Sequence, residues 1–161
     1  MQTAPIINCV WICRTIGREL EELANEYFPF EVGGILAGYL SNESAVITDI
    51  VGPGPLAQHH RESFLPDHDY QTEQMHRIFW ESKGKAIYLG DWHTHPEGPA
   101  ALSSLDIRTM RTIADSPDAR CPNPVMLLLA QANSKWIVRA FCLANTQAPL
   151  AKAGAVRIFL F

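Results

Sequence analysis

Two histidines separated by a single residue, with an aspartate shortly after them, constrain this chain more than any other feature. His93 and His95 flank Thr94, and Ser103 and Asp106 follow within a short distance. Because side chains of a β-strand alternate between its two faces, both imidazoles are expected on one face of a strand. Two neutral nitrogens and one carboxylate suit Zn²⁺, and three protein ligands leave one position open for water. The spacing therefore predicts a catalytic metal site, not a structural one.

The segment from Ser103 to Asp106 has a second interpretation, because Ser-x-x-acid ahead of a helical pattern is a capping box. The two interpretations are compatible. A serine hydroxyl can accept one hydrogen bond while donating another, and a carboxylate has one oxygen for a metal and one for a local bond. We expect a helix over 104–114 whose cap positions both groups.

A carboxylate also opens an apolar, glycine-rich run near the N-terminal end of the chain. Glu31 precedes Val32-Gly33-Gly34-Ile35-Leu36-Ala37-Gly38, which predicts a buried strand over 31–40. The small residues allow close approach of neighbouring backbones, and a carboxylate at that place has little water to solvate it. Taken alone, Glu31 would more often be a surface acid at a strand edge.

Taken together, Glu31, the run His93-Thr94-His95-Pro96, and the pair Ser103 and Asp106 resemble the signature of the JAMM (JAB1/MPN/Mov34) zinc metalloproteases. The resemblance spans most of the chain from Glu31 onward. It implies that His93, His95 and Asp106 bind zinc, that Glu31 acts as acid and base, and that Ser103 assists the oxyanion. It also implies a cytidine-deaminase-like fold, in which helices flank a central mixed sheet.

The loop between Gly52 and Asp67, together with the run from Gly90 to Pro99, is similar to the small bacterial JAB proteins encoded with E1- and E2-like partners in type II CBASS anti-phage operons. This resemblance implies an isopeptidase that cuts after the C-terminus of a ubiquitin-like protein or of a conjugated cGAS-like nucleotidyltransferase. The loop from Gly52 to Asp67 is the candidate wall of the substrate groove. The alternatives are a peptidase that matures a small ubiquitin-like sulfur-carrier protein and a non-catalytic MPN scaffold.

The sequence alone does not decide the roles of several residues near the motif. Asp91 shares the predicted face of the two histidines and either orients a ligand or faces solvent. Glu97 either lies on the rim or touches substrate. Trp92, on the opposite face, is expected in the core. The other histidines have no ligand spacing and are interpreted as ordinary loop and helix-surface residues: His59, His60, His68 and His76.

Hydrophobic periodicity places strands and helices in mixed order, without regular βα alternation. Strands are predicted over 5–13, 31–40, 44–51, 86–93, 125–131, 135–143 and 155–160, and helices over 15–27 (capped by Thr15), 68–82 and 104–114. This order favours an α+β fold, or a mixed-sheet α/β sandwich, in one domain over 1–161.

Composition excludes several classes of function. A net charge of −4 argues against a nucleic-acid partner, and the sequence holds no apolar run long enough to span a membrane. The four cysteines, without a secretory pattern at the start of the chain, are expected to be free thiols in a cytoplasmic protein.

Overall fold

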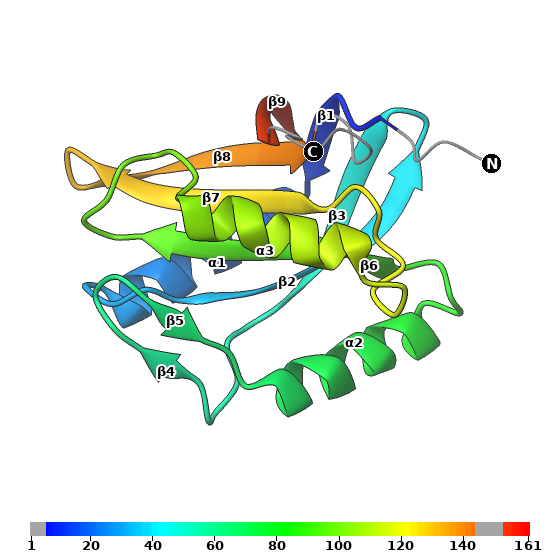
Figure 1. The fold of residues 1–161 in the computed structure, drawn as a ribbon, viewed down its shortest axis with the longest axis horizontal. Helices are drawn as coiled ribbons and strands as arrows, with labels where there is room; N and C mark the ends of the chain where they lie inside the picture. Colours follow the sequence, from blue (N-terminus) through cyan, green and yellow to red (C-terminus); the bar gives the residue numbers. More distant parts are fainter. Residues whose placement is uncertain (1–5, 144–152) are drawn as a thin grey trace.

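The computed structural model describes residues 6–143 and 153–161 of the chain (Figure 1). The helices are α1 (Arg14–Tyr27), α2 (His68–Glu81) and α3 (Ser104–Asp115). The strands are β1 (Cys9–Ile12), β2 (Gly33–Ser41), β3 (Ser44–Val51), β4 (Gln58–His59), β5 (Phe64–Leu65), β6 (Ile87–His95), β7 (Val125–Ala132), β8 (Lys135–Leu143) and β9 (Ala153–Leu160). No helix in these two ranges is long and apolar enough to cross a membrane.

The main sheet is mixed, which confirms the α+β class predicted from the order of the elements. Its strands follow the order β1-β3-β2-β6-β7-β8-β9. The pairs β1–β3, β1–β9 and β6–β7 are parallel, and the others are antiparallel. Because the short β1 pairs with both β3 and β9, the sheet closes on itself as a barrel.

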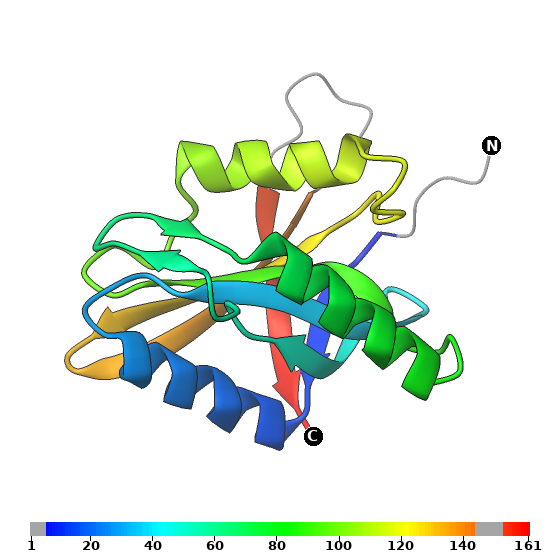
Figure 2. The same ribbon diagram turned by 90° about the horizontal axis from the view of Figure 1, so that it is seen from below.

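Helices cover both faces of the sheet, and β7 shows the consequence. The first six residues of β7 are all buried, as expected for a strand covered on two sides. Alternate β7 residues face the cluster that includes α1: Val125, Leu127 and Leu129. The residues between them, Met126 and Leu128, pack with Met110 of α3. In Figure 2, α1 and α3 accordingly lie on opposite sides of the sheet.

The start of α1 differs from the sequence prediction. Thr15 was expected as the N-cap, but the helix begins at Arg14, and Cys13 occupies the cap position without a side-chain cap bond. The Thr15 hydroxyl instead lies 2.9 Å from the Cys13 sulfur. The preceding strand is correspondingly shorter, over Cys9–Ile12, and residue 5 of the predicted strand lies outside the described residues. All four cysteines are free thiols, as predicted.

The segment from Gly52 to Asp67 was predicted as an irregular loop and contains a small hairpin, formed by β4 and β5. Its ends are held by Asp67, whose carboxylate caps α2 by accepting from Tyr70 N (3.2 Å) and also accepts from Leu56 N (3.1 Å). Gly54 has a φ of +88°, and a Cβ there would meet Asp67 and Tyr70. This turn therefore requires glycine.

Candidate metal centre and catalytic cavity

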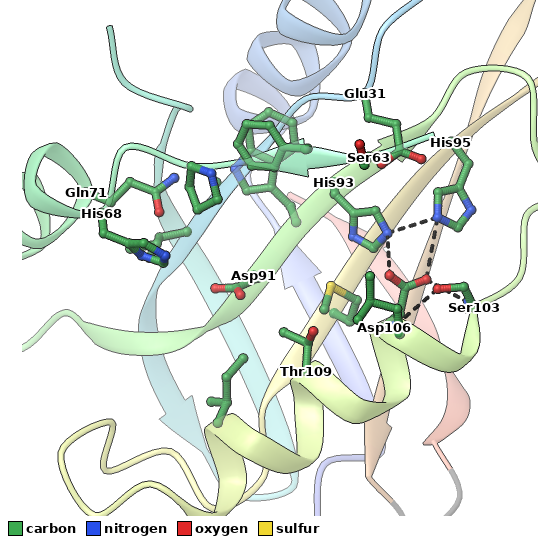
Figure 3. Close-up of a pocket in the computed structure, with 18 of the residues that line it drawn as sticks. Glu31, Ser63, His68, Gln71, Asp91, His93, His95, Ser103, Asp106 and Thr109 are labelled. Atoms are coloured by element: carbon green, nitrogen blue, oxygen red, sulfur yellow. Dashed lines mark hydrogen bonds and ion pairs between the residues drawn. The ribbon is translucent and has the colours of Figure 1, made fainter. Parts of the chain in front are cut away.

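Strand β6 presents its two motif histidines on one face and buries Trp92 and Thr94, which alternate with them, on the other. Trp92 is 1% exposed, and Thr94 is fully buried. The Trp92 indole donates to Val51 O at 3.1 Å, which confirms its predicted place in the core. His93 and His95 are partly buried on the other face and point into a cavity (Figure 3).

The pairing of β2 with β6 brings Glu31 to the histidines. Gly33 pairs with His93, so the antiparallel register, continued by two residues, sets Glu31 opposite His95. The connection is anchored by Thr94 N donating to Val32 O at 2.9 Å. Glu31 itself is not in the strand, contrary to the prediction that β2 begins there, because its amide donates to His60 O of the hairpin segment and not to β6.

Helix α3 supplies the third candidate ligand through its first turn. Ser103 and Asp106 form the predicted capping box: Asp106 N donates to Ser103 Oγ at 3.1 Å, and Ser103 N donates to Asp106 Oδ2 at 2.6 Å. The cap fixes the Asp106 carboxylate, whose Oδ1 lies 3.1 Å from His93 Nε2. The helix start and the side-chain cluster are thus one structure, as the two compatible interpretations of this segment predicted.

The three side chains fit a tetrahedral metal ion. The His93 and His95 Nε2 atoms are 3.1 Å apart, and His95 Nε2 lies 3.5 Å from Asp106 Oδ2. Ligands of zinc at 2.0–2.1 Å in tetrahedral geometry are separated by about 3.3 Å, so the spacing matches. His95 Nδ1 lies 3.1 Å from Pro99 O. Since a carbonyl only accepts, Nδ1 carries a proton, and in the neutral ring Nε2 keeps a lone pair for a metal.

The electrostatics of this cluster favour a positive charge at its centre. Burial alone would raise the pKa of Asp106, but hydrogen bonds with His93 and His95 hold the pKa well below its usual range. Burial would likewise lower the pKa of His95, yet the Asp106 carboxylate and Pro99 O raise it. The site thus stabilises cationic charge next to an ionised carboxylate, as a divalent ion requires.

Glu31 and Asp106 are both partly buried, but they differ in their hydrogen bonds. Among the described residues, none is found to the Glu31 carboxylate. Burial raises its pKa, although His93 and His95 pull in the opposite direction. Figure 3 shows its carboxylate beside the two histidines, whereas the candidate metal ligands point at one another. A carboxyl group in this position is suited to exchange protons with a molecule in the cavity.

These groups line one cavity of about 560 Å³ that continues past His93 along β6. Toward the far end Asp91 accepts a hydrogen bond from the Tyr88 hydroxyl at 2.8 Å. Asp91 therefore faces the cavity, not bulk solvent, and no hydrogen bond from it to a candidate ligand is found among the described residues. Glu97 is exposed and forms an ion pair with Arg61 of the hairpin segment at 2.7 Å, which places it on the rim.

Sequence reasoning missed the contribution of His59. It was interpreted as an ordinary loop residue, but its ring stacks on Tyr27 with centroids 4.1 Å apart, and its Nδ1 lies 2.9 Å from Glu31 O. No spacing in the sequence could have indicated this, because the contact depends on how the hairpin folds back. His60, His68 and His76 are exposed, as predicted, and His68, at the start of α2, also borders the cavity.

A candidate three-ligand metal site beside a carboxyl group, on an α+β fold, is the arrangement expected of a metal-dependent hydrolase. Residues 16–142 match the family model for prokaryotic homologs of the JAB domain. The chain belongs to this family, and it is a metalloprotease of the JAB type.

Similar proteins agree with that assignment. The chain is 36% identical over 134 residues, covering 82% of each chain, to the "Probable metalloprotease y4qB" of Sinorhizobium fredii. It is 30% identical over 113 residues to a "CD-NTase/cGAS isopeptidase" of Escherichia coli, covering 69% of this chain and 68% of that one. The solution structure of a Desulfitobacterium hafniense protein matches the fold with a TM-score of 0.67 at 20% identity, covering 94% of this chain and 92% of the other.

Proposed function

We propose that this chain is a zinc-dependent isopeptidase that hydrolyses the amide bond after the C-terminus of a ubiquitin-like protein or of a conjugated cGAS-like nucleotidyltransferase. It would act in the bacterial cytoplasm, with E1- and E2-like proteins as operon partners in anti-phage defence. The observation that carries the proposal is the convergence of His93, His95 and Asp106, with Glu31 beside them, on one cavity of a JAB-family chain.

The three ligands would be His93 Nε2, His95 Nε2 and one oxygen of Asp106. A zinc ion held there would supply a Lewis acid and a water molecule with a pKa near 7. The support for zinc is the chemistry of the donor set: two imidazoles and one carboxylate, at separations that match tetrahedral coordination. A complete ligand set of this kind also argues against the non-catalytic scaffold.

Glu31 would carry the protons of the reaction. Its partly buried carboxylate accepts a proton from the attacking water and later delivers that proton to the nitrogen of the leaving amine. The water oxygen forms the new bond to the carbonyl carbon, and the carbon–nitrogen bond breaks, so that an acid and an amine result. Glu31 is suited to both steps, because burial raises its pKa and so favours the protonated form more than in water.

Ser103 would stabilise the charge that develops on the substrate carbonyl oxygen. Its Oγ already accepts from Asp106 N, which orients the side chain and leaves the hydroxyl hydrogen available as a donor. Ser103 also lines the cavity. A donor held in place before the reaction lowers the energy of the transition state without reorganisation.

The substrate class is proposed from the relatives and from the hairpin. Three similar proteins carry the name "CD-NTase/cGAS isopeptidase", at 27–33% identity. The hairpin β4–β5 borders the cavity through Ser63, Phe64 and Pro66, next to the candidate catalytic groups. A substrate tail lying extended along this border would reach the metal site as an added strand.

The decisive experiment offers the purified protein a nucleotidyltransferase conjugate and a ubiquitin-like conjugate, each with and without a chelator. Mass spectrometry then maps the cut. We expect release of the intact C-terminus, no cleavage with chelator, and recovery when zinc is added back. A matched variant, Glu31→Gln, should bind zinc and leave the conjugate uncut. Cleavage that persists in chelator, or cleavage of neither conjugate, would contradict the proposal.

A further inference from the structure

We infer that the far end of the cavity is a subsite for a positively charged side chain, lysine or arginine, of a residue next to the cleaved bond. Such a subsite would give the isopeptidase proposed above a preference among substrates, and it rests on that proposed function. It is carried by Asp91, a carboxylate on the cavity wall that the proposed reaction does not use.

Asp91 is held in place and only partly satisfied. Its Oδ1 accepts the Tyr88 hydroxyl at 2.8 Å, and no hydrogen bond to Oδ2 is found among the described residues. Asp91 follows Gly90 and shares the cavity face of β6 with His93. Figure 3 shows the carboxylate directed into the space between His93 and the pair His68 and Gln71. A carboxylate so placed gains most from a donor that carries positive charge.

The surroundings at this end offer acceptors. Gln71 is 5% exposed, and its amide nitrogen donates to Gly52 O at 3.1 Å, which leaves the side-chain oxygen as a second acceptor. The described residues that line the cavity include four carboxylic acids and neither lysine nor arginine. Besides Asp91, the ionisable side chains found at this end among the described residues are those of Tyr88 and His68. Among the lining acids, Asp91 is the one at this end of the cavity and away from the candidate metal ligands' contacts, so a cationic side chain is favoured here over an anionic one.

The lining of the cavity also includes apolar side chains, against which the stem of a long basic side chain can pack. They include Ile35, Phe64, Trp92, Ile113 and Met126. Asp91 is two residues from His93 along β6, a distance of about 6.7 Å at strand spacing. Five bonds of an extended lysine side chain, from Cα to the ammonium, span about 6.3 Å. A side chain that starts beside the metal can therefore place its charge at Asp91.

The test uses a charged probe and its neutral isostere, so that binding is measured apart from hydrolysis. Butylguanidinium and butylurea are titrated into the zinc-loaded protein and followed by NMR. We expect butylguanidinium to shift the amides around Tyr88 and Asp91 and to bind at least about tenfold more tightly than butylurea, as a charge-assisted bond predicts. Asp91→Asn keeps an acceptor for Tyr88 and should remove the difference. Glu73→Gln, on the exposed surface of α2, is the control and should keep it.

A second comparison connects the subsite to cleavage. In peptides cut by the protein, arginine at the position next to the cleaved bond is replaced by citrulline. The kcat/KM ratio should fall roughly 10- to 100-fold in wild type and by less than about threefold in Asp91→Asn. Equal binding of the two probes by wild type, or a preference unchanged in Asp91→Asn, would overturn the inference while leaving the peptidase intact. A protein that binds butylguanidinium through Asp91 but cuts no conjugate would instead contradict the proposed function.

Discussion

Replacing Glu31 by glutamine separates proton transfer from metal binding, since the structure assigns these tasks to different side chains. The Glu31→Gln variant would keep the side-chain volume and the backbone bonds of the site: the amide to His60 O and the carbonyl near His59. It would lose only the ability to exchange a proton. General acid–base catalysis contributes roughly 100- to 10,000-fold, so kcat should fall by that factor, about 3–5 kcal/mol of activation free energy.

The same substitution should not destabilise the metal-free protein at neutral pH. Burial raises the pKa of Glu31, so the folded state prefers the protonated carboxyl more than the unfolded state does. The native state therefore binds more protons between the usual glutamate pKa and the raised one, and the stability of wild type falls as pH rises through that window. Glutamine has no proton to lose. The unfolding free energy of Glu31→Gln relative to wild type should rise from pH 4 toward pH 7.

The assay combines steady-state cleavage of the conjugate, zinc content by elemental analysis, and urea unfolding of chelator-treated protein at several pH values. Glu73→Gln removes the same charge from the exposed surface of α2 and serves as the control with unchanged kcat. A Glu31→Gln protein that keeps more than a tenth of the wild-type rate would refute the proton-transfer role. Loss of zinc from that variant would instead show that Glu31 is a ligand.

The metal ligand, the helix cap and the hairpin each give a further prediction. Asp106→Asn keeps a cap acceptor but loses the charge, so zinc occupancy by elemental analysis should fall. Zinc at 100-fold above its Kd should stabilise the wild-type fold by about 2.7 kcal/mol, and the rise in Tm on adding zinc should be smaller in the variant. Ser103→Ala should cost about 1 kcal/mol of stability through the lost cap and lower kcat about 100-fold; a loss of stability without a kcat effect would leave Ser103 only structural. Leu65 is 55% exposed on β5 and stands between Phe64 and Pro66, which line the cavity. If the substrate lies along the hairpin as proposed, Leu65→Ser should raise KM at unchanged zinc content and kcat; an unchanged KM would contradict the proposed groove.

The clustering of the three candidate ligands could be predicted from the sequence because its geometry is local. Alternation along one strand fixes the common face of His93 and His95, and the capping box fixes the orientation of Asp106. Glu31 is a different case, since its place depends on the pairing of β2 with β6, which no local pattern specifies. Only the resemblance to a known signature placed Glu31 at the site. The prediction that a strand begins at Glu31 was wrong, because β2 begins at Gly33.

The hairpin and the far end of the cavity could not be predicted for a related reason. Strands of two residues, such as β4 and β5, are too short to show alternation, so a loop was the expected result. The strand face of Asp91 could be predicted, but its neighbours in the cavity could not. Tyr88 is on the same strand, whereas His68 and Gln71 belong to α2. Side chains that meet only through tertiary packing leave no trace in spacing.

If Asp106 is a metal ligand as proposed, the capping box makes metal binding and the first turn of α3 mutually dependent. Asp106 Oδ2 is held by Ser103 N at 2.6 Å, while Oδ1 faces His93, so one carboxylate serves the helix end and the metal site together. The three ligands therefore converge through backbone bonds of the fold itself. Binding an ion to ligands held in this way requires little further ordering, which favours affinity. It follows that weakening the cap should also weaken metal affinity, although the cap serine is not itself a ligand.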